Sequence, residues 1–133
     1  MGARTKARKR ALDILFESEL RGLGSGATLS ERREVNEPPV GDYTVTLVEG
    51  VIEHAADIDE VISTYATDWP IERMPAVDRN ILRIGVYELQ YVDEVPTAVA
   101  LSEAVSLARE LSTDDSPAFI NGLLAKIANN PTL

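Results

Sequence analysis

The sequence predicts an all-α protein of about six or seven helices joined by short connections. Apolar residues recur at intervals of three and four along most of the chain, which is the spacing of one helix face. Glycine and proline clusters interrupt this pattern and mark helix ends. The β-branched run TVTLV at residues 44–48 resembles a strand by itself, but it lies within a longer helical pattern. No strand is therefore expected.

The length and composition are those of one soluble domain. The chain has 133 residues, of which 44% are hydrophobic and 26% are charged. No apolar run approaches the ~20 residues that a membrane span requires. Because the N-terminus also lacks the apolar core of a secretory signal, we expect a cytoplasmic protein that does not contact membranes.

Catalytic and metal chemistry have no obvious residues in this chain. The absence of cysteine excludes disulfides, thiol catalysis and thiolate metal sites. The single histidine, His54, has no nucleophile motif near it. No glycine-rich phosphate loop and no metal-spaced His/Asp cluster is present. We therefore expect no enzyme activity, no cofactor and no metal.

The central helix is expected within residues 74–92, because apolar residues there cover more than one helix face. Two neighbouring seams run along it: Val77, Ile81 and Ile84, then Leu82, Val86 and Leu89. The remaining side is polar and consists of Asp78, Arg79, Asn80, Arg83 and Glu88. This strip is either a solvated face with weak ion pairs or a protein-docking face.

Other helices follow from their end signals. We expect one helix from about Thr5 to near Arg21, a short polar helix over 28–36, and two tandem helices within 43–67. A helical turn over 71–74 should precede the central helix. Two further helices should begin at Pro96 and near Pro117, with each proline at or near the first helical position. Asp57 with Glu60 resembles a capping box that starts the second tandem helix.

Two features of the last helix need separate explanations. Asp115 or Ser116 is expected to cap its start. Asn121 and Gly122 are poor helix formers inside an otherwise good helix. A side-chain hydrogen bond and close backbone packing are the expected reasons for them.

The first ten residues are strongly basic. They hold five of the thirteen basic residues and no acid, whereas the remainder carries eight basic and 22 acidic residues, and the net charge of the chain is −9. Cations at a helix N-terminus oppose its dipole and repel each other at a spacing of four, so stability does not explain them. Three interpretations stay open: a frayed tail, an arm paired with the acidic body, or an arginine-rich segment that binds RNA.

Three stretches together resemble the NusB family of transcription antitermination factors. They are KARKRALDILFESEL, AVDRNILRIGVYEL and VPTAVALSEAVSLARELSTDDSPAFINGLL, in the family's order and spacing. The resemblance implies a compact bundle of seven helices in two subdomains, with residues 1–133 forming a single domain and residues 1–10 forming a basic RNA-binding arm. It implies no catalysis.

The resemblance also implies partners. Proteins similar to this one bind the boxA element of ribosomal RNA leader transcripts together with NusE, a ribosomal protein of the small subunit. This pair then recruits further Nus factors to RNA polymerase, in transcription antitermination and termination. Some members instead form homodimers through the NusE face, and NusB-like domains also serve RNA-modifying enzymes as accessory domains, so both remain alternatives.

Site residues follow from the resemblance by position. The residues expected to bind RNA are Arg4, Lys6, Arg8, Lys9, Arg10, Tyr65, Asp115 and Ser116. The residues expected to bind NusE are Phe16, Glu72, Asp78, Arg79 and Arg83. One departure concerns Leu111 and Ser112, which stand where the family often has an aromatic residue and a glycine.

Overall fold

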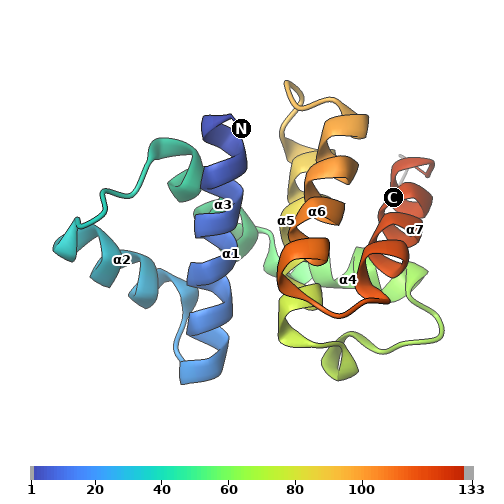
Figure 1. Cartoon of the computed structure of the whole chain (residues 1–133). Helices are drawn as coiled ribbons and strands as arrows, with labels where there is room; N and C mark the ends of the chain where they lie inside the picture. Colours follow the sequence, from blue (N-terminus) through green and yellow to red (C-terminus); the bar gives the residue numbers. More distant parts are fainter. Residues whose placement is uncertain (1, 131–133) are drawn as a thin grey trace. The chain divides into compact units, whose positions relative to one another are not determined.

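The computed structural model describes residues 2–130, which form seven α-helices and one 3-10 turn and contain no β-strand (Figure 1). The helices are α1 (Ala3–Arg21), α2 (Ser25–Val35), α3 (Asp42–Glu53), α4 (Ala55–Tyr65), α5 (Ala76–Tyr91), α6 (Thr97–Leu111) and α7 (Ser116–Ala128), and the turn η1 is Ile71–Arg73. The all-α prediction is confirmed. None of the described helices is long and apolar enough to cross a membrane.

The chain divides into two compact units, as expected for two subdomains. The first unit is Met1–Glu53 and contains α1, α2 and α3, and the second is His54–Leu133 and contains α4 to α7. The ends of the expected domain, Met1 and residues 131–133, lie outside the described residues.

In the first unit, α1 packs against α2 and α3. Its inward side buries Ala11, Leu12, Ile14 and Leu15. Helix α1 ends at Gly22, whose φ of 66° gives the left-handed conformation that glycine adopts without strain. The predicted end near Arg21 is thus correct.

Ion pairs join α1 to α2 on the surface of this unit. Arg21 contacts Glu17 and Glu31, each at 3.0 Å, and Arg32 contacts Asp13 at 3.0 Å and also Glu17. Hydrogen bonds from Arg21 lower the pKa of both glutamates, and Arg32 lowers that of Glu17 further. Because these groups are exposed to water, their contribution to stability is small.

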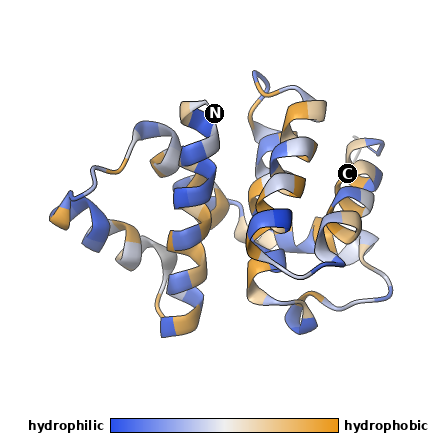
Figure 2. Cartoon of the chain, viewed as in Figure 1, coloured by the Kyte–Doolittle hydropathy of each residue, from blue (hydrophilic) through white to orange (hydrophobic). Residues whose placement is uncertain are grey.

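In the second unit, α5 packs against α4, α6 and α7. Both predicted seams contribute to its core, since Ile81, Leu82, Ile84 and Val86 are buried. A Cβ added at Gly85 would lie 2.8 Å from Cδ1 of Leu124, so α5 approaches α7 closely at this glycine. Figure 2 shows hydrophobic and hydrophilic residues alternating along these helices, as the helical periodicity requires.

Some predicted helix starts are displaced. Helix α4 begins at Ala55 with His54 as its N-cap, so the capping box at Asp57 is wrong, and no side-chain capping bond forms there. The His54 ring instead stacks on Tyr91, with 3.9 Å between centroids. Pro96, predicted in the first turn of α6, is the extended residue just before it. Proline restricts φ but leaves ψ free to be extended, which permits this position.

The polar side of α5 is largely buried, which contradicts the predicted exposed strip. Asp78 is 0% exposed, and Asn80 and Glu88 are each 1% exposed. Asp78 is buried because the α6–α7 connection folds over it. The Ser112 hydroxyl donates to Oδ1 of Asp78, and the Ser116 hydroxyl donates to Oδ2 at 2.7 Å. A buried carboxylate is tolerated when such donors satisfy it.

Replacing Asp78 should therefore destabilise the protein. Asp78→Ala removes two hydrogen bonds to a charged acceptor, so we expect the free energy of unfolding to fall by about 3 kcal/mol in urea titrations followed by circular dichroism. Asp114 is an exposed carboxylate in the same connection, so Asp114→Ala serves as the control. It should change the free energy of unfolding by less than about 0.5 kcal/mol. Equal effects of the two substitutions would contradict the assigned role of Asp78.

Candidate functional site

The basic residues at the start of the chain belong to the first turns of α1. Helix α1 begins at Ala3, so a frayed tail does not describe them. Arg4, Lys6 and Lys9 are exposed, and Arg10 is half-buried and donates from Nη2 to the carbonyl of Pro38 at 3.3 Å. These turns contain no acidic residue that would complement the helix dipole. The position of these cations at a helix N-terminus is therefore not explained by the helix dipole.

Tyr43 of α3 organises two of these arginines. The guanidinium carbons of Arg4 and Arg8 lie 4.5 and 5.8 Å from the centre of its ring. This attraction offsets the repulsion between two cations one turn apart. The sequence contained no signal for it, because α1 and α3 are distant along the chain.

Arg8 corrects one expectation, because its side chain is only 4% exposed. It precedes Ala11 and Leu12 by three and four residues and so lies on their buried face. Arg8 is therefore no longer a candidate for direct RNA contact.

Tyr65 lies at the end of α4 beside an aromatic pocket of about 500 Å³ in the second unit. Trp69 and Phe119 meet there edge to face, with ring centres 4.9 Å apart. Lys126 and Asp68 supply its charged groups. All three aromatic side chains are half-buried and keep accessible surface. Such a pocket can take a flat unsaturated ring between aromatic faces, with a cation near any attached phosphate.

The sequence alone did not single out Trp69, Phe119 or Lys126 as site residues. One signal was available for two of them: aromatic residues are rare in this chain, at 5% of the total. Trp69 and Phe119 are two of these rare residues, and the segments that carry them meet at the pocket. The helical spacing of Phe119 by itself would place it in the core of the last helix. Its accessible surface depends on how α7 packs beside residues 65–69, which periodicity does not report.

Asp115 and Ser116, both expected near RNA, differ in accessibility. Asp115 is exposed at the N-cap position of α7, and its side chain makes no capping bond. Ser116 is 2% exposed and bonded to Asp78. The structure thus leaves Asp115 available to a ligand and uses Ser116 inside the fold.

The residues expected to bind NusE divide in a similar way. Glu72 is exposed and Phe16 is half-buried, but Asp78 is enclosed. Arg79 donates to the carbonyls of Ile71 and Met74, at 3.1 and 2.9 Å, and so holds η1 beside α5. Asp78 is therefore withdrawn from the docking face.

Arg83, the fifth of these residues, pairs α5 with α4. Its Nε and Nη2 donate to the two carboxylate oxygens of Asp59, at 2.9 and 3.0 Å. Such a two-bonded pair fixes the orientation of the guanidinium plane. Arg83 thus keeps part of its surface but not its full freedom to bind a partner.

Leu20 is a docking candidate that the sequence analysis missed. It follows Phe16 by one helical turn and is 68% exposed, although apolar residues at this spacing usually form the buried face of a helix. An exposed leucine beside a partly exposed phenylalanine extends an apolar surface on α1.

Asn121 and Gly122 lack the structural reasons that were predicted for them. A Cβ added at Gly122 would meet no atom within 4 Å, so no close packing requires glycine. Asn121 is exposed and makes no side-chain hydrogen bond to the residues at 2–130. Gly122 instead borders the aromatic pocket.

Among the described residues, no group of three or more His, Asp or Glu side chains could hold a metal ion.

These features define a small all-helical binding protein with a basic first helix and an aromatic pocket. The model of the NusB family matches residues 5–129. The transcription antitermination protein NusB of Kineococcus radiotolerans is 60% identical over 128 residues, which cover 96% of this chain and 94% of the relative. The NusB protein of Nocardioides sp. is 57% identical, covering 98% and 96%. The chain therefore belongs to the NusB family.

Solved structures agree with this assignment. The NusB of T. maritima superposes with a TM-score of 0.83 at 30% identity, covering 96% of this chain and 92% of that one. A structure of antitermination factors NusB and NusE in complex with dsRNA gives a TM-score of 0.83 at 28% identity, covering 96% of both chains. The fold expected from the resemblance is confirmed.

The free space at Gly122 can be tested by stability. Gly122→Ala should raise the free energy of unfolding by about 1 kcal/mol, because alanine favours a helix and meets no clash. Gly85→Ala is the matched control in α5 and should lower it, because its Cβ would press on the buried Leu124 side chain. Loss of stability in Gly122→Ala would show that this glycine is needed for packing.

Proposed function

We propose that this protein is a transcription antitermination factor that binds boxA RNA together with NusE and helps assemble Nus factors on RNA polymerase. The observation that carries the proposal is the cluster of exposed cations on the first turns of α1, in a chain with net charge −9. Exposed cations grouped on one helix end attract the phosphates of RNA. The protein works in the cytoplasm as an adaptor, without catalysis.

The RNA contacts divide between phosphates and bases. Arg4, Lys6 and Lys9 bind phosphates, with Arg10 as a partly accessible fourth cation. Tyr65 stacks on a base at the aromatic pocket, and the Asp115 carboxylate accepts a hydrogen bond from a base amino group. Because an acidic surface repels phosphates elsewhere, it directs the RNA backbone to the basic turns.

The salt dependence of RNA affinity tests this proposal. Three to four neutralised phosphates give a slope of log K against log salt of roughly −2 to −3 for single-stranded RNA. Lys6→Ala with Lys9→Ala should make the slope shallower by about 1.4, measured by fluorescence anisotropy with boxA RNA. Arg33→Ala, an exposed arginine of α2, is the control and should leave it unchanged. A wild-type affinity that does not depend on salt would refute the phosphate contacts.

NusE is proposed to contact two surfaces: the exposed apolar surface of α1 in the first unit, and the residues around η1 in the second unit. Phe16 with Leu20 supplies apolar contact, and Glu72 supplies an exposed charge. Arg79 and Arg83 take part mainly by holding η1 and α4 against α5. The alternative is that this apolar surface forms a homodimer, because the exposed Leu20 side chain can contact a second copy of this chain as well as NusE.

Replacing Leu20 tests this surface. Because Leu20 is exposed, its replacement should change NusE binding and leave the stability of the fold nearly unchanged. Leu20→Asp should weaken NusE binding by about tenfold or more in isothermal titration calorimetry, since a charge would be placed in an apolar contact. Val35→Asp, at the end of α2, is a matched control with 70% exposure against 68% for Leu20. Equal NusE affinity of the two variants would exclude Leu20 from the interface.

A further inference from the structure

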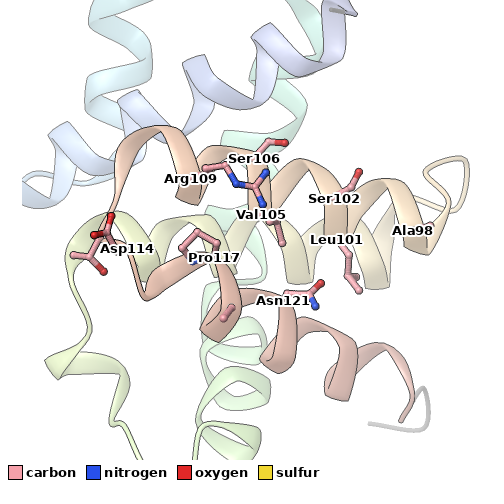
Figure 3. Close-up of a pocket in the computed structure, with 11 residues that line it drawn as sticks. Ala98, Leu101, Ser102, Val105, Ser106, Arg109, Asp114, Pro117 and Asn121 are labelled. Carbon is pink, nitrogen blue, oxygen red and sulfur yellow. The ribbon is translucent and has the colours of Figure 1, made fainter.

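A groove between α6 and α7 in the second unit has no role in the contacts described above. Its volume is about 920 Å³. Figure 3 shows the α6 residues Leu101, Ser102, Val105, Ser106 and Arg109 along one wall, with Asn121 and Pro117 on α7 and Asp114 at the connection. The groove therefore combines a small apolar floor with hydroxyl, amide and charged groups.

Asn121 is the residue in this groove that the fold does not explain. Asparagine is unfavourable within a helix because its side chain competes for backbone hydrogen bonds. Here the amide forms no hydrogen bond with any described residue and is exposed on the groove side of α7. Since no contact among the described residues requires an asparagine at this position, its presence points to a role in binding a ligand.

The charges of the groove select the kind of ligand. Among the described residues that line it, Arg109 and Asp114 are the only charged ones, and their opposite formal charges cancel. The second unit as a whole carries more acidic than basic residues. A phosphate group would gain little there, whereas a neutral flat group with donors and acceptors on its edge fits this lining.

The groove also continues from the aromatic pocket. Ala118 lines both hollows, and the successive residues Asn121 and Gly122 face one hollow each. Helix α7 thus forms the ridge between the two hollows, and Ala118 borders both of them. A strand with one base beside Tyr65 can place a following base across this ridge.

We propose that the α6–α7 groove is a second base-binding subsite, in which the Asn121 amide reads the edge of an adenine in the bound RNA. An asparagine amide can donate and accept at the same time and so matches the N7 acceptor and N6 donor of adenine. Arg109 lies over the opposite wall, where its guanidinium plane can cover the base. This subsite rests on the proposed RNA-binding function, which the α1 substitutions test separately.

The experiment measures base preference in the full-length chain. Wild type, Asn121→Ala and Asn129→Ala are titrated with boxA RNA and with a series in which each adenine is replaced singly by guanine. In wild type, one replacement should weaken binding by roughly tenfold or more, and Asn121→Ala should abolish the difference at that position only. Asn129→Ala makes the same change at the exposed C-cap residue that follows α7, outside the groove, and should behave as wild type.

Thermal unfolding of Asn121→Ala separates recognition from structure. We expect an unchanged or higher Tm, because alanine is the better helix former and no hydrogen bond is lost. A lower Tm would show a structural role and overturn the subsite. Unchanged base preference, or an equal loss of affinity for every RNA in the series, would also overturn it.

Two further outcomes keep this proposal distinct from the general one. If Arg109→Ala makes the salt slope shallower by about 0.7, the groove holds a phosphate and the assignment to a base is wrong. If the wild-type chain binds none of the RNAs, the proposed function itself fails, and the subsite fails with it. Salt-dependent binding with no contribution from Asn121 would overturn the subsite alone.

Discussion

The arrangement of the second unit depends on the buried carboxylate of Asp78. It accepts hydrogen bonds from Ser112 and Ser116, which lie at the two ends of the α6–α7 connection. Burying a charge is costly unless donors surround it. The α6–α7 connection is therefore most stable where Ser112 and Ser116 can both donate to Asp78 on α5. The Ser112 hydroxyl is a donor that a glycine at this position would not provide. The start of α7 is placed by this contact.

The position of α7 in turn determines both hollows of the second unit. Phe119 and Gly122 border the aromatic pocket, while Pro117 and Asn121 border the groove with α6. Because both hollows are lined by the same helix, the spacing of their α7 residues is set by helix geometry. A site carried on a helix presents its side chains with less loss of conformational entropy on binding.

Phosphate attraction and base recognition are assigned to different elements. Exposed cations lie on the first turns of α1, and the candidate base sites lie in a unit with an excess of acidic residues. Cations give affinity with little sequence preference, whereas amide and aromatic groups give preference with little long-range attraction. This division also explains why Arg8, stacked near Tyr43 inside the first unit, is not needed as a phosphate ligand.

The sequence by itself determined the helical class, the end of α1 at Gly22, the apolar seams of α5 and the basic first turns. Helical periodicity and capping are local, so neighbouring residues suffice to predict them. Only the tertiary structure decided that Asp78 and Arg8 point inward and that Phe119 and Leu20 keep accessible surface. Burial depends on segments far apart in the chain, as the sequence separation of 34 between Asp78 and Ser112 shows. A polar residue on a helix is therefore assigned to the surface by its type, and its true position follows from what folds over it.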